Sequence, residues 1–393
     1  NFKASFSMLG VNPYNVASNY TYTVVPMFIL MGELAMYSGI SRDLFNAANV
    51  WLGRQPGGLG IATVSGCAGF AAVSGDSMAT AVTMASVALP EMRRHGYNPA
   101  FSCATLACGG TLGVLIPPSL SFIIYAIVTE TSTGRLFMAG VIPGIILSSL
   151  FILVLLITAY RHPELLPRGE RHSMKDKVAS LSGILPILFL IVIIMGGILA
   201  GFFSATEAGA IGSVVVWLFS LAARRISWQQ TKECLINTVY IAGKLLFILM
   251  CVALLGVFIA YTRLTVTLAQ YASGLDVDRH IILLVIIIFY IIMGCLMNVI
   301  PMILLTLPAI YPTIIELGFD PVWFGVIVVI LMEAGQITPP VGINVFALSS
   351  VATDVPMAGI FRRVVPFFLA MLMLVFLLTV FPQIALWLPS VLF

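Results

Sequence analysis

Polar residues that could bind an ion stand where two long apolar runs of this 393-residue chain are interrupted. Ser74, Gly75, Asp76 and Ser77 interrupt the first run, and Asn298 interrupts the second. Asp76 and Asn298 lie 222 residues apart, so an oxygen-bearing side chain stands at both interruptions. Carboxylate, amide and hydroxyl oxygens are the ligands that hard cations prefer. The pattern therefore predicts an oxygen-only site suited to Na⁺.

Two pairs of adjacent prolines, Pro117-Pro118 and Pro339-Pro340, lie inside apolar runs and are also 222 residues apart. Proline has no amide hydrogen, and the residue before it avoids the helical region. Each pair therefore predicts a broken helix whose freed carbonyls, together with the hydroxyls of Thr111 and Thr338, could serve as cation ligands. The full set of predicted Na⁺ ligands is Ser74, Gly75, Asp76, Thr111, Gly113, Asn298, Gly335, Thr338 and Gly342.

The second half of each broken helix is predicted to begin near Ser119 or Gly342. A helix N-terminus carries partial positive charge, which favours a carboxylate ligand. The residues predicted to contact such a substrate are Ser77, Pro117, Pro118, Ser119, Pro339, Pro340 and Asn344.

Structural roles remain open for several of these side chains. Ser74, Asp76 and Asn298 could cap helices at a turn. Thr111 and Thr338 could hydrogen-bond to their own helices.

Glu333 lies inside the second broken helix, where an ionisable residue is a functional candidate by default. The alternative is a structural ion pair with Lys244 or Arg263.

A duplication explains the common offset. The window Pro90–Ser119 recurs in altered form at Tyr311–Val341. All four prolines of the first window have counterparts in the second: Pro90, Pro99, Pro117 and Pro118 correspond to Pro312, Pro321, Pro339 and Pro340. The offset puts the counterpart of residues 206–223 mostly before residue 1, so a further helix is expected upstream.

The composition predicts an all-α integral membrane protein. Sixty per cent of residues are apolar and 9% are charged, whereas soluble proteins average about 25% charged residues. Several apolar runs exceed the roughly 20 residues that a helix needs to cross a bilayer. A net charge of +3 gives no indication of a nucleic-acid partner.

The repeats predict three segments. Residues 1–160 form the first repeat, with an arm helix, a re-entrant hairpin at about 57–94 and a broken helix at 99–130. Residues 161–203 form a loop and a connecting helix. Residues 204–393 form the second repeat, with a hairpin at about 280–316 and a broken helix at 321–350. Interfacial helices are expected within 41–53, 226–241 and 264–275, and a closing span at 364–388.

The distribution of basic residues predicts opposite orientations for the two repeats. The loop at 161–177 is rich in arginine and lysine and is expected in the cytoplasm. Counting spans from this loop, the first hairpin opens to the cytoplasm and the second to the opposite side. Inverted repeats with discontinuous helices are typical of secondary transporters, which bind ions and substrate where the repeats meet.

The sequence resembles the large membrane subunit of the tripartite ATP-independent periplasmic (TRAP) transporters. The matching elements are AAVSGDSMATA (71–81), LPEM-R-x-x-GY-x-P (89–99), GVLIPPS (113–119), ITPPVG (337–342) and MAGIFRRVVPF (357–367). Asp76 departs from the family pattern, since the family commonly has a serine at the turn of the first hairpin, which we call the first tip.

This resemblance implies an elevator-type, Na⁺-driven importer in the bacterial inner membrane, with Na⁺ as the coupling ion and without an organic cofactor or a transition metal. It also implies two partners, a small membrane (Q-type) subunit and a periplasmic substrate-binding (P-type) protein. The substrate would be an organic acid such as a C4-dicarboxylate or sialic acid.

Three other functions remain as alternatives. One is a Na⁺/carboxylate symporter that needs no binding protein. A channel would need a continuous polar path, and no row of polar residues at helical spacing lines any span. A membrane enzyme is disfavoured because the sequence has no Ser-His-Asp, H-E-x-x-H or G-x-S-x-G set.

Overall fold

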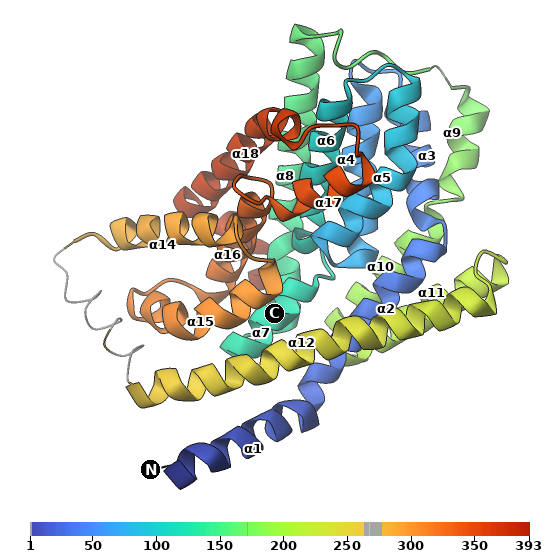
Figure 1. Cartoon of the computed structure of the whole chain (residues 1–393). Coiled ribbons are helices and arrows are strands. Elements are labelled where there is room, and N and C mark those ends of the chain that lie inside the picture. Colours follow the sequence, from blue (N-terminus) through green and yellow to red (C-terminus); the bar gives the residue numbers. More distant parts are fainter. Residues whose placement is uncertain (1, 171, 263–266, 268–276) are drawn as a thin grey trace.

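The computed structural model describes residues 2–170, 172–262, 267 and 277–393, and every regular element within these ranges is a helix (Figure 1). Six helices in the described part of the chain are long and apolar enough to cross a membrane, or up to eight if each bent pair is one span. A helix satisfies all its own backbone hydrogen bonds, which hydrocarbon requires. The predicted all-α, multi-pass membrane fold is confirmed.

The N-terminal part begins with α1 (Phe2–Ser18), a 3₁₀ turn (Tyr20–Thr23), α2 (Val24–Tyr37) and α3 (Ile40–Leu52). The chain bends by 61° between α2 and α3. Helix α3 buries Ile40, Leu44 and Phe45 on one side and packs against α4. The apolar residues whose helical spacing predicted this helix therefore form the face that packs against α4.

The first predicted hairpin and broken helix are both present. The hairpin consists of α4 (Gly58–Ser74) and α5 (Ser77–Arg94), and the broken helix of α6 (Pro99–Leu115) and α7 (Leu120–Thr129), bent by 43°. The interruption spans Ile116 to Ser119 and contains the proline pair, as the missing proline N–H groups predicted.

The connecting helices are α8 (Thr133–Arg161), α9 (Met174–Leu181), α10 (Leu185–Leu199), α11 (Ala205–Ala222) and α12 (Trp228–Thr262). The expected interfacial stretch at 226–241 and the residues that follow it form one continuous helix of 35 residues, α12. It contains no proline, and isolated glycines such as Gly243 do not break a helical ladder. The expected interfacial helix at 264–275 lies outside the described residues, apart from Thr267.

The second repeat comprises α14 (Arg279–Gly294), α15 (Val299–Glu316), α16 (Pro321–Gln336), α17 (Ile343–Val351), α18 (Met357–Val380) and α19 (Gln383–Leu392). It contains the predicted second hairpin and second broken helix. The expected single span at 364–388 was wrong, since it divides between α18 and α19. Pro382 follows Phe381, whose ψ of 75° is outside the helical region.

The short half-helix of each repeat packs against helices of the other repeat. Helix α17 of the second repeat lies against α5 and α6 of the first, and α7 of the first lies against α15 of the second (Figure 1). The Tyr125 hydroxyl on α7 donates to the Pro321 carbonyl at 2.7 Å, and the Tyr125 ring meets the Tyr311 ring edge-on. On the other side, Arg93 at the end of α5 bonds to Asp354 beyond α17 at 2.6 Å.

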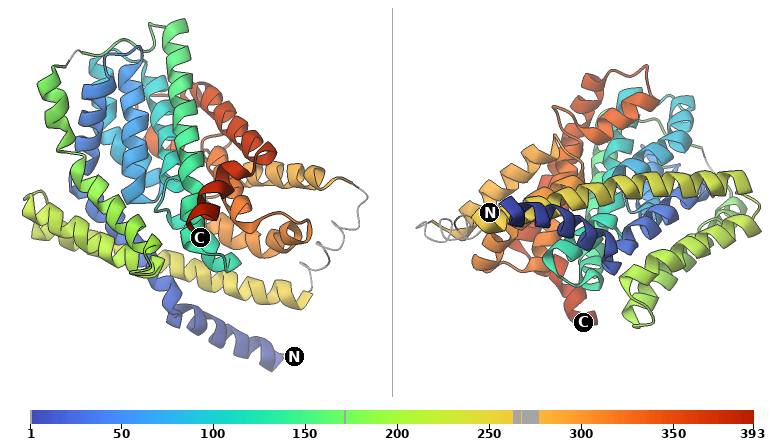
Figure 2. Two further views of the ribbon diagram at one scale, coloured as in Figure 1. Left: turned by 180° about the vertical axis from the view of Figure 1, so that it is seen from behind. Right: turned by 60° about the horizontal axis from the view of Figure 1, so that its bottom comes forward.

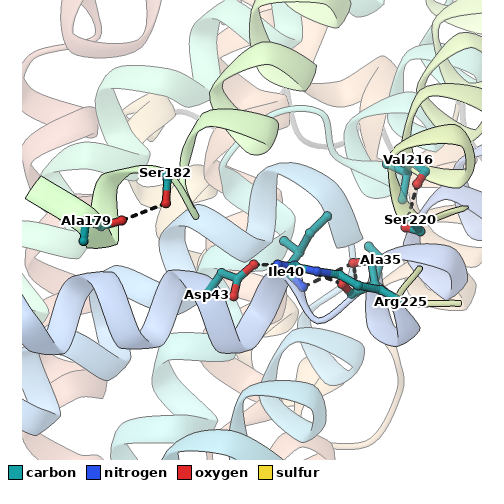
Figure 3. A network of polar contacts seen from close by, with 9 residues as sticks. Ala35, Ile40, Asp43, Ala179, Ser182, Val216, Ser220 and Arg225 are labelled. Carbon is teal, nitrogen blue, oxygen red and sulfur yellow. Dashed lines mark hydrogen bonds and ion pairs between the residues drawn. The ribbon is translucent and has the colours of Figure 1, made fainter. Parts of the chain in front are cut away.

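Helices α2, α11 and α12 form a separate group along one edge, with α1 running beside α12 (Figure 2). This group is tied to the corner between α2 and α3 by Arg225, which follows α11. Figure 3 shows Arg225 pointing toward Asp43, with which it forms an ion pair. Its guanidinium also donates to the Ser38 carbonyl at 3.3 Å. The ion pair between Arg225 and Asp43 therefore links the end of α11 to α3, next to the bend between α2 and α3.

Candidate functional site

The tip of the first hairpin contacts the first helix break directly. The Leu120 amide, at the start of α7, donates to the Gly75 carbonyl at 3.3 Å. At Gly113, a Cβ atom would lie 2.6 Å from the Asp76 carbonyl oxygen, closer than real Cβ contacts allow. Glycine is thus required at position 113 because the backbone of the tip lies against α6. The structure brings together Gly75, Asp76, Gly113 and the break, as predicted.

The predicted side-chain ligands of this half already have protein partners. Asp76 is the N-cap of α5, and its Oδ1 accepts from the Ala79 amide at 2.7 Å. The Ser74 hydroxyl contacts the Thr80 hydroxyl and the Asp76 carbonyl. Thr111 donates to the Cys108 carbonyl at 2.6 Å. The structural roles considered for Asp76 and Thr111 are therefore present, and their role as Na⁺ ligands stays a prediction.

Free carbonyl oxygens at the first break follow from its sequence. The residues four positions after Gly113 and Val114 are Pro117 and Pro118. Neither proline can donate the usual helical hydrogen bond to these carbonyls. The break therefore presents acceptor oxygens beside the tip.

The second break is contacted by the end of α14, just before the second tip. A Cβ on Gly335 would lie 2.5 Å from Cα of Gly294, at the end of α14. The Cys295 sulfur contacts the Thr338 hydroxyl at 3.1 Å, and Thr338 donates to the Gly335 carbonyl at 2.9 Å. Asn298 is the N-cap of α15 but makes no capping bond with its side chain. Its amide therefore remains available, whereas the Thr338 hydroxyl is engaged with its own helix.

The two breaks differ in exposure. Pro117, Pro118 and Ser119 are buried, whereas Pro339 and Pro340 are exposed. Ser119 caps α7, with its hydroxyl accepting from the Phe122 amide at 3.4 Å. Gly342 is the N-cap of α17. The half-helices thus begin at the predicted residues, and the residues just before the second one, Pro339 to Val341, are exposed.

The predicted substrate residues Ser77 and Asn344 come together from different repeats. Both lie beside the carboxylate of Glu333, which is 1% exposed. The ion pair considered for Glu333 is not formed with Lys244, whose ammonium lies 3.9 Å from the Tyr240 ring centroid. Arg263 lies outside the described residues.

Gln336 is a candidate site residue that the sequence analysis does not name. It is fully buried and stands three residues after Glu333, on the same face of α16. Because Gln336 is a polar residue directly before the helix break, its position could have indicated a place in the site.

The donor atoms around the breaks are mainly oxygens. No group of three or more His, Cys, Asp or Glu residues that could hold a metal ion occurs within the described ranges. Backbone carbonyls, hydroxyls, amides and single carboxylates suit a hard cation rather than a transition metal. This chemistry fits Na⁺.

Comparisons with known proteins identify the family. Residues 4–384 match the model of the tripartite ATP-independent periplasmic transporter, DctM component. The C4-dicarboxylate TRAP transporter large permease protein DctM of Pseudomonas aeruginosa is 36% identical over 98% of this chain and 90% of that protein. The sialic acid TRAP transporter large permease protein SiaM of Vibrio cholerae is 31% identical over 99% of this chain and 90% of that protein.

A solved structure supports the fold alone. The YdaH transporter of Alcanivorax borkumensis matches with a TM-score of 0.61, at 13% sequence identity, over 96% of this chain and 87% of that chain. Together with the paired hairpins and broken helices, the full-length family match makes the assignment plain. The chain belongs to the DctM family, the large permease proteins of tripartite ATP-independent periplasmic transporters.

Proposed function

We propose that this chain is the transport subunit of a Na⁺-driven importer of an organic acid. The observation that carries the proposal is the contact of each hairpin tip with the proline break of its own repeat. Gly113 lies against the Asp76 carbonyl at the first tip, and Gly335 lies against the backbone of Gly294 and Cys295, just before the second tip. An arrangement of this kind, repeated twice, supplies two sites for a small, hard cation.

The substrate class follows from the half-helices and from the relatives. The N-termini of α7 and α17, at Ser119 and Gly342, favour negative charge. The two relatives described above are named for C4-dicarboxylate and sialic acid, which are both organic acids. A carboxylate bound between the half-helices, next to Na⁺, would couple the two gradients.

We infer that this chain works in an assembly of three parts, as the tripartite description of its family suggests. We infer that a small membrane subunit accompanies it in the bacterial inner membrane and that a periplasmic binding protein delivers the substrate. The proposed movement is an elevator, in which the hairpins and broken helices shift together against the group of α2, α11 and α12. The packing of α17 on α5 and of α7 on α15 supports movement of the two repeats as one unit.

Uptake into proteoliposomes tests this function. The chain is purified with its small subunit and reconstituted, and a radiolabelled C4-dicarboxylate or sialic acid is added with or without the loaded binding protein. We expect accumulation only with an inward Na⁺ gradient and the binding protein, and none with a K⁺ gradient of equal size.

Other outcomes separate the rival functions. Equal accumulation of free substrate without the binding protein would indicate the independent Na⁺/carboxylate symporter. Rapid flux without any gradient would indicate a channel, and a converted product would indicate an enzyme.

A further inference from the structure

Glu333 is a buried carboxylate without a compensating charge among the described residues. It lies on α16, three residues before the end of this helix, and is 1% exposed. Neither of its carboxylate oxygens has a hydrogen-bond partner of standard geometry. An ionised carboxylate in this setting is costly unless a cation or strong donors stabilise it. A cation bound at this position would stabilise the ionised form of the Glu333 carboxylate.

The amide side chains nearby are unsatisfied as well. Gln336 and Asn344, which stand on either side of the second break, are both 0% exposed. The oxygen and the nitrogen of each amide lack hydrogen-bond partners. Buried polar groups are ordinarily paired, so each such group requires an explanation. A ligand with several coordination positions would explain all three side chains together.

The first repeat contributes to the same place. Ser77, the first residue of α5, lies beside the Glu333 carboxylate, as does Asn344. The carboxylate of Asp76 is close enough to act on Glu333 electrostatically. Two ionised carboxylates near each other repel unless a positive charge lies close to both. The surroundings of Glu333 therefore favour a cation over an anionic substrate group.

We propose that Glu333 is the anionic ligand of a Na⁺ site between the two repeats. Its other ligands are the amide oxygens of Gln336 and Asn344 and the hydroxyl of Ser77. This site is distinct from the two tip–break sites, because it joins α5 of one repeat to α16 and α17 of the other. It rests on the proposed function in that Na⁺ is the coupling ion.

Binding of Na⁺ at this site has a structural consequence. The cation joins the hairpin tip of the first repeat to the break of the second, so its release weakens contact between them. The amide nitrogens of Gln336 and Asn344, turned away from the cation, remain free to donate to a substrate carboxylate. Na⁺ binding thereby organises donors for the acid.

The Na⁺ dependence of thermal stability tests the site. Wild type, Glu333→Gln and the control Glu33→Gln are purified with the small subunit and melted at increasing NaCl, with choline chloride holding ionic strength constant. Glu33 is a suitable control because it is a half-buried glutamate of α2 that accepts a bond from Asn237 at 3.3 Å. Glutamine has nearly the size and shape of glutamate, so the variant should fold.

We expect Glu333→Gln to raise the half-saturating Na⁺ concentration at least tenfold, whereas Glu33→Gln follows wild type. Without Na⁺, Glu333→Gln should melt at the same temperature as wild type or higher, because the substitution removes an uncompensated charge. A merely structural glutamate would instead lower the melting temperature at every Na⁺ concentration.

An unchanged Na⁺ response in Glu333→Gln overturns the site, and so does a loss of substrate affinity with Na⁺ affinity intact. Either result leaves the proposed function standing if wild-type uptake still requires Na⁺. Conversely, Na⁺-independent uptake by wild type refutes the proposed function. In that case a Na⁺-dependent melting shift that disappears in Glu333→Gln would still support the site.

Discussion

At the residue scale, the side chain of Asp76 has two possible roles, one as a helix cap and one as a negative charge at the hairpin tip. Its carboxylate caps α5 by accepting from the Ala79 amide, and the negative charge lies next to the helix N-terminus, where it is favourable. The same charge stands at the hairpin tip, beside the carbonyls of the first break. A serine can provide the cap but not the charge. The two roles are therefore separable by substitution.

We predict that Asp76→Ser retains the stability of wild type but weakens Na⁺ binding, whereas Asp76→Ala loses both. Loss of the cap lowers the free energy of unfolding by about 1 kcal/mol. Melting temperature reports the cap, and the Na⁺ dependence of uptake reports the charge. If Asp76→Ser has wild-type Na⁺ affinity, the carboxylate is only a cap.

At the scale of elements, two glycines set the distance between hairpin and broken helix. A methyl group at Gly113 would press on the Asp76 carbonyl and the Thr80 hydroxyl, and one at Gly335 would press on the backbone of Gly294 and Cys295. Backbone cannot move aside cheaply, so α4–α5 and α6–α7 would separate. The freed carbonyls would then no longer face the tip.

We predict that Gly113→Ala destabilises the protein by about 1–3 kcal/mol and reduces Na⁺-driven uptake, because overpacking displaces the tip. Gly196→Ala in α10 is the matched control, since nothing lies within 4 Å of the added methyl group. Alanine in a helix interior is favoured over glycine by up to about 1 kcal/mol, so the control should be neutral or stabilised. Equal melting temperatures and uptake rates for the two variants would contradict the close contact.

At the scale of the whole molecule, the repeats are alike in sequence but differ in exposure. Ser119 and Val341 occupy corresponding positions, 222 residues apart. Ser119 is 0% exposed, whereas Val341 is 40% exposed. An inverted pair of repeats that alternates access to a central site would exchange these two environments. The burial of Ser119 and the exposure of Val341 would belong to one of the two states of the proposed elevator movement.

We predict that a cysteine at position 341 reacts faster with a hydrophilic maleimide than one at position 119, in a Cys251→Ser background. The five other native cysteines are buried, and Cys251 is exposed. During turnover with Na⁺, binding protein and substrate, labelling of Ser119→Cys should rise and that of Val341→Cys should fall. Constant labelling of both in a transporting protein would exclude the exchange.

Much of this architecture was predictable because its causes are local. Proline lacks an amide hydrogen wherever it lies, so Pro117-Pro118 and Pro339-Pro340 interrupted their helices as expected. The turn at Ser74–Ser77 could likewise be located from its polarity. Pro382 carried the same kind of signal for the end of α18, yet a single span was expected there. The uninterrupted course of α12 was missed because polar residues near its start resemble an interfacial segment.

By itself, then, the sequence determined the membrane-spanning helices, the duplication, both tips, both breaks and the residues that begin α7 and α17. Only the tertiary structure decided that Glu333 and Asn344 meet Ser77 across the repeats, and that one break is buried while the other is exposed. Backbone hydrogen bonding depends on neighbours along the chain and so can be read from order and spacing. Contacts between repeats depend on how whole helices pack, and residues more than 250 positions apart leave no local pattern of their meeting.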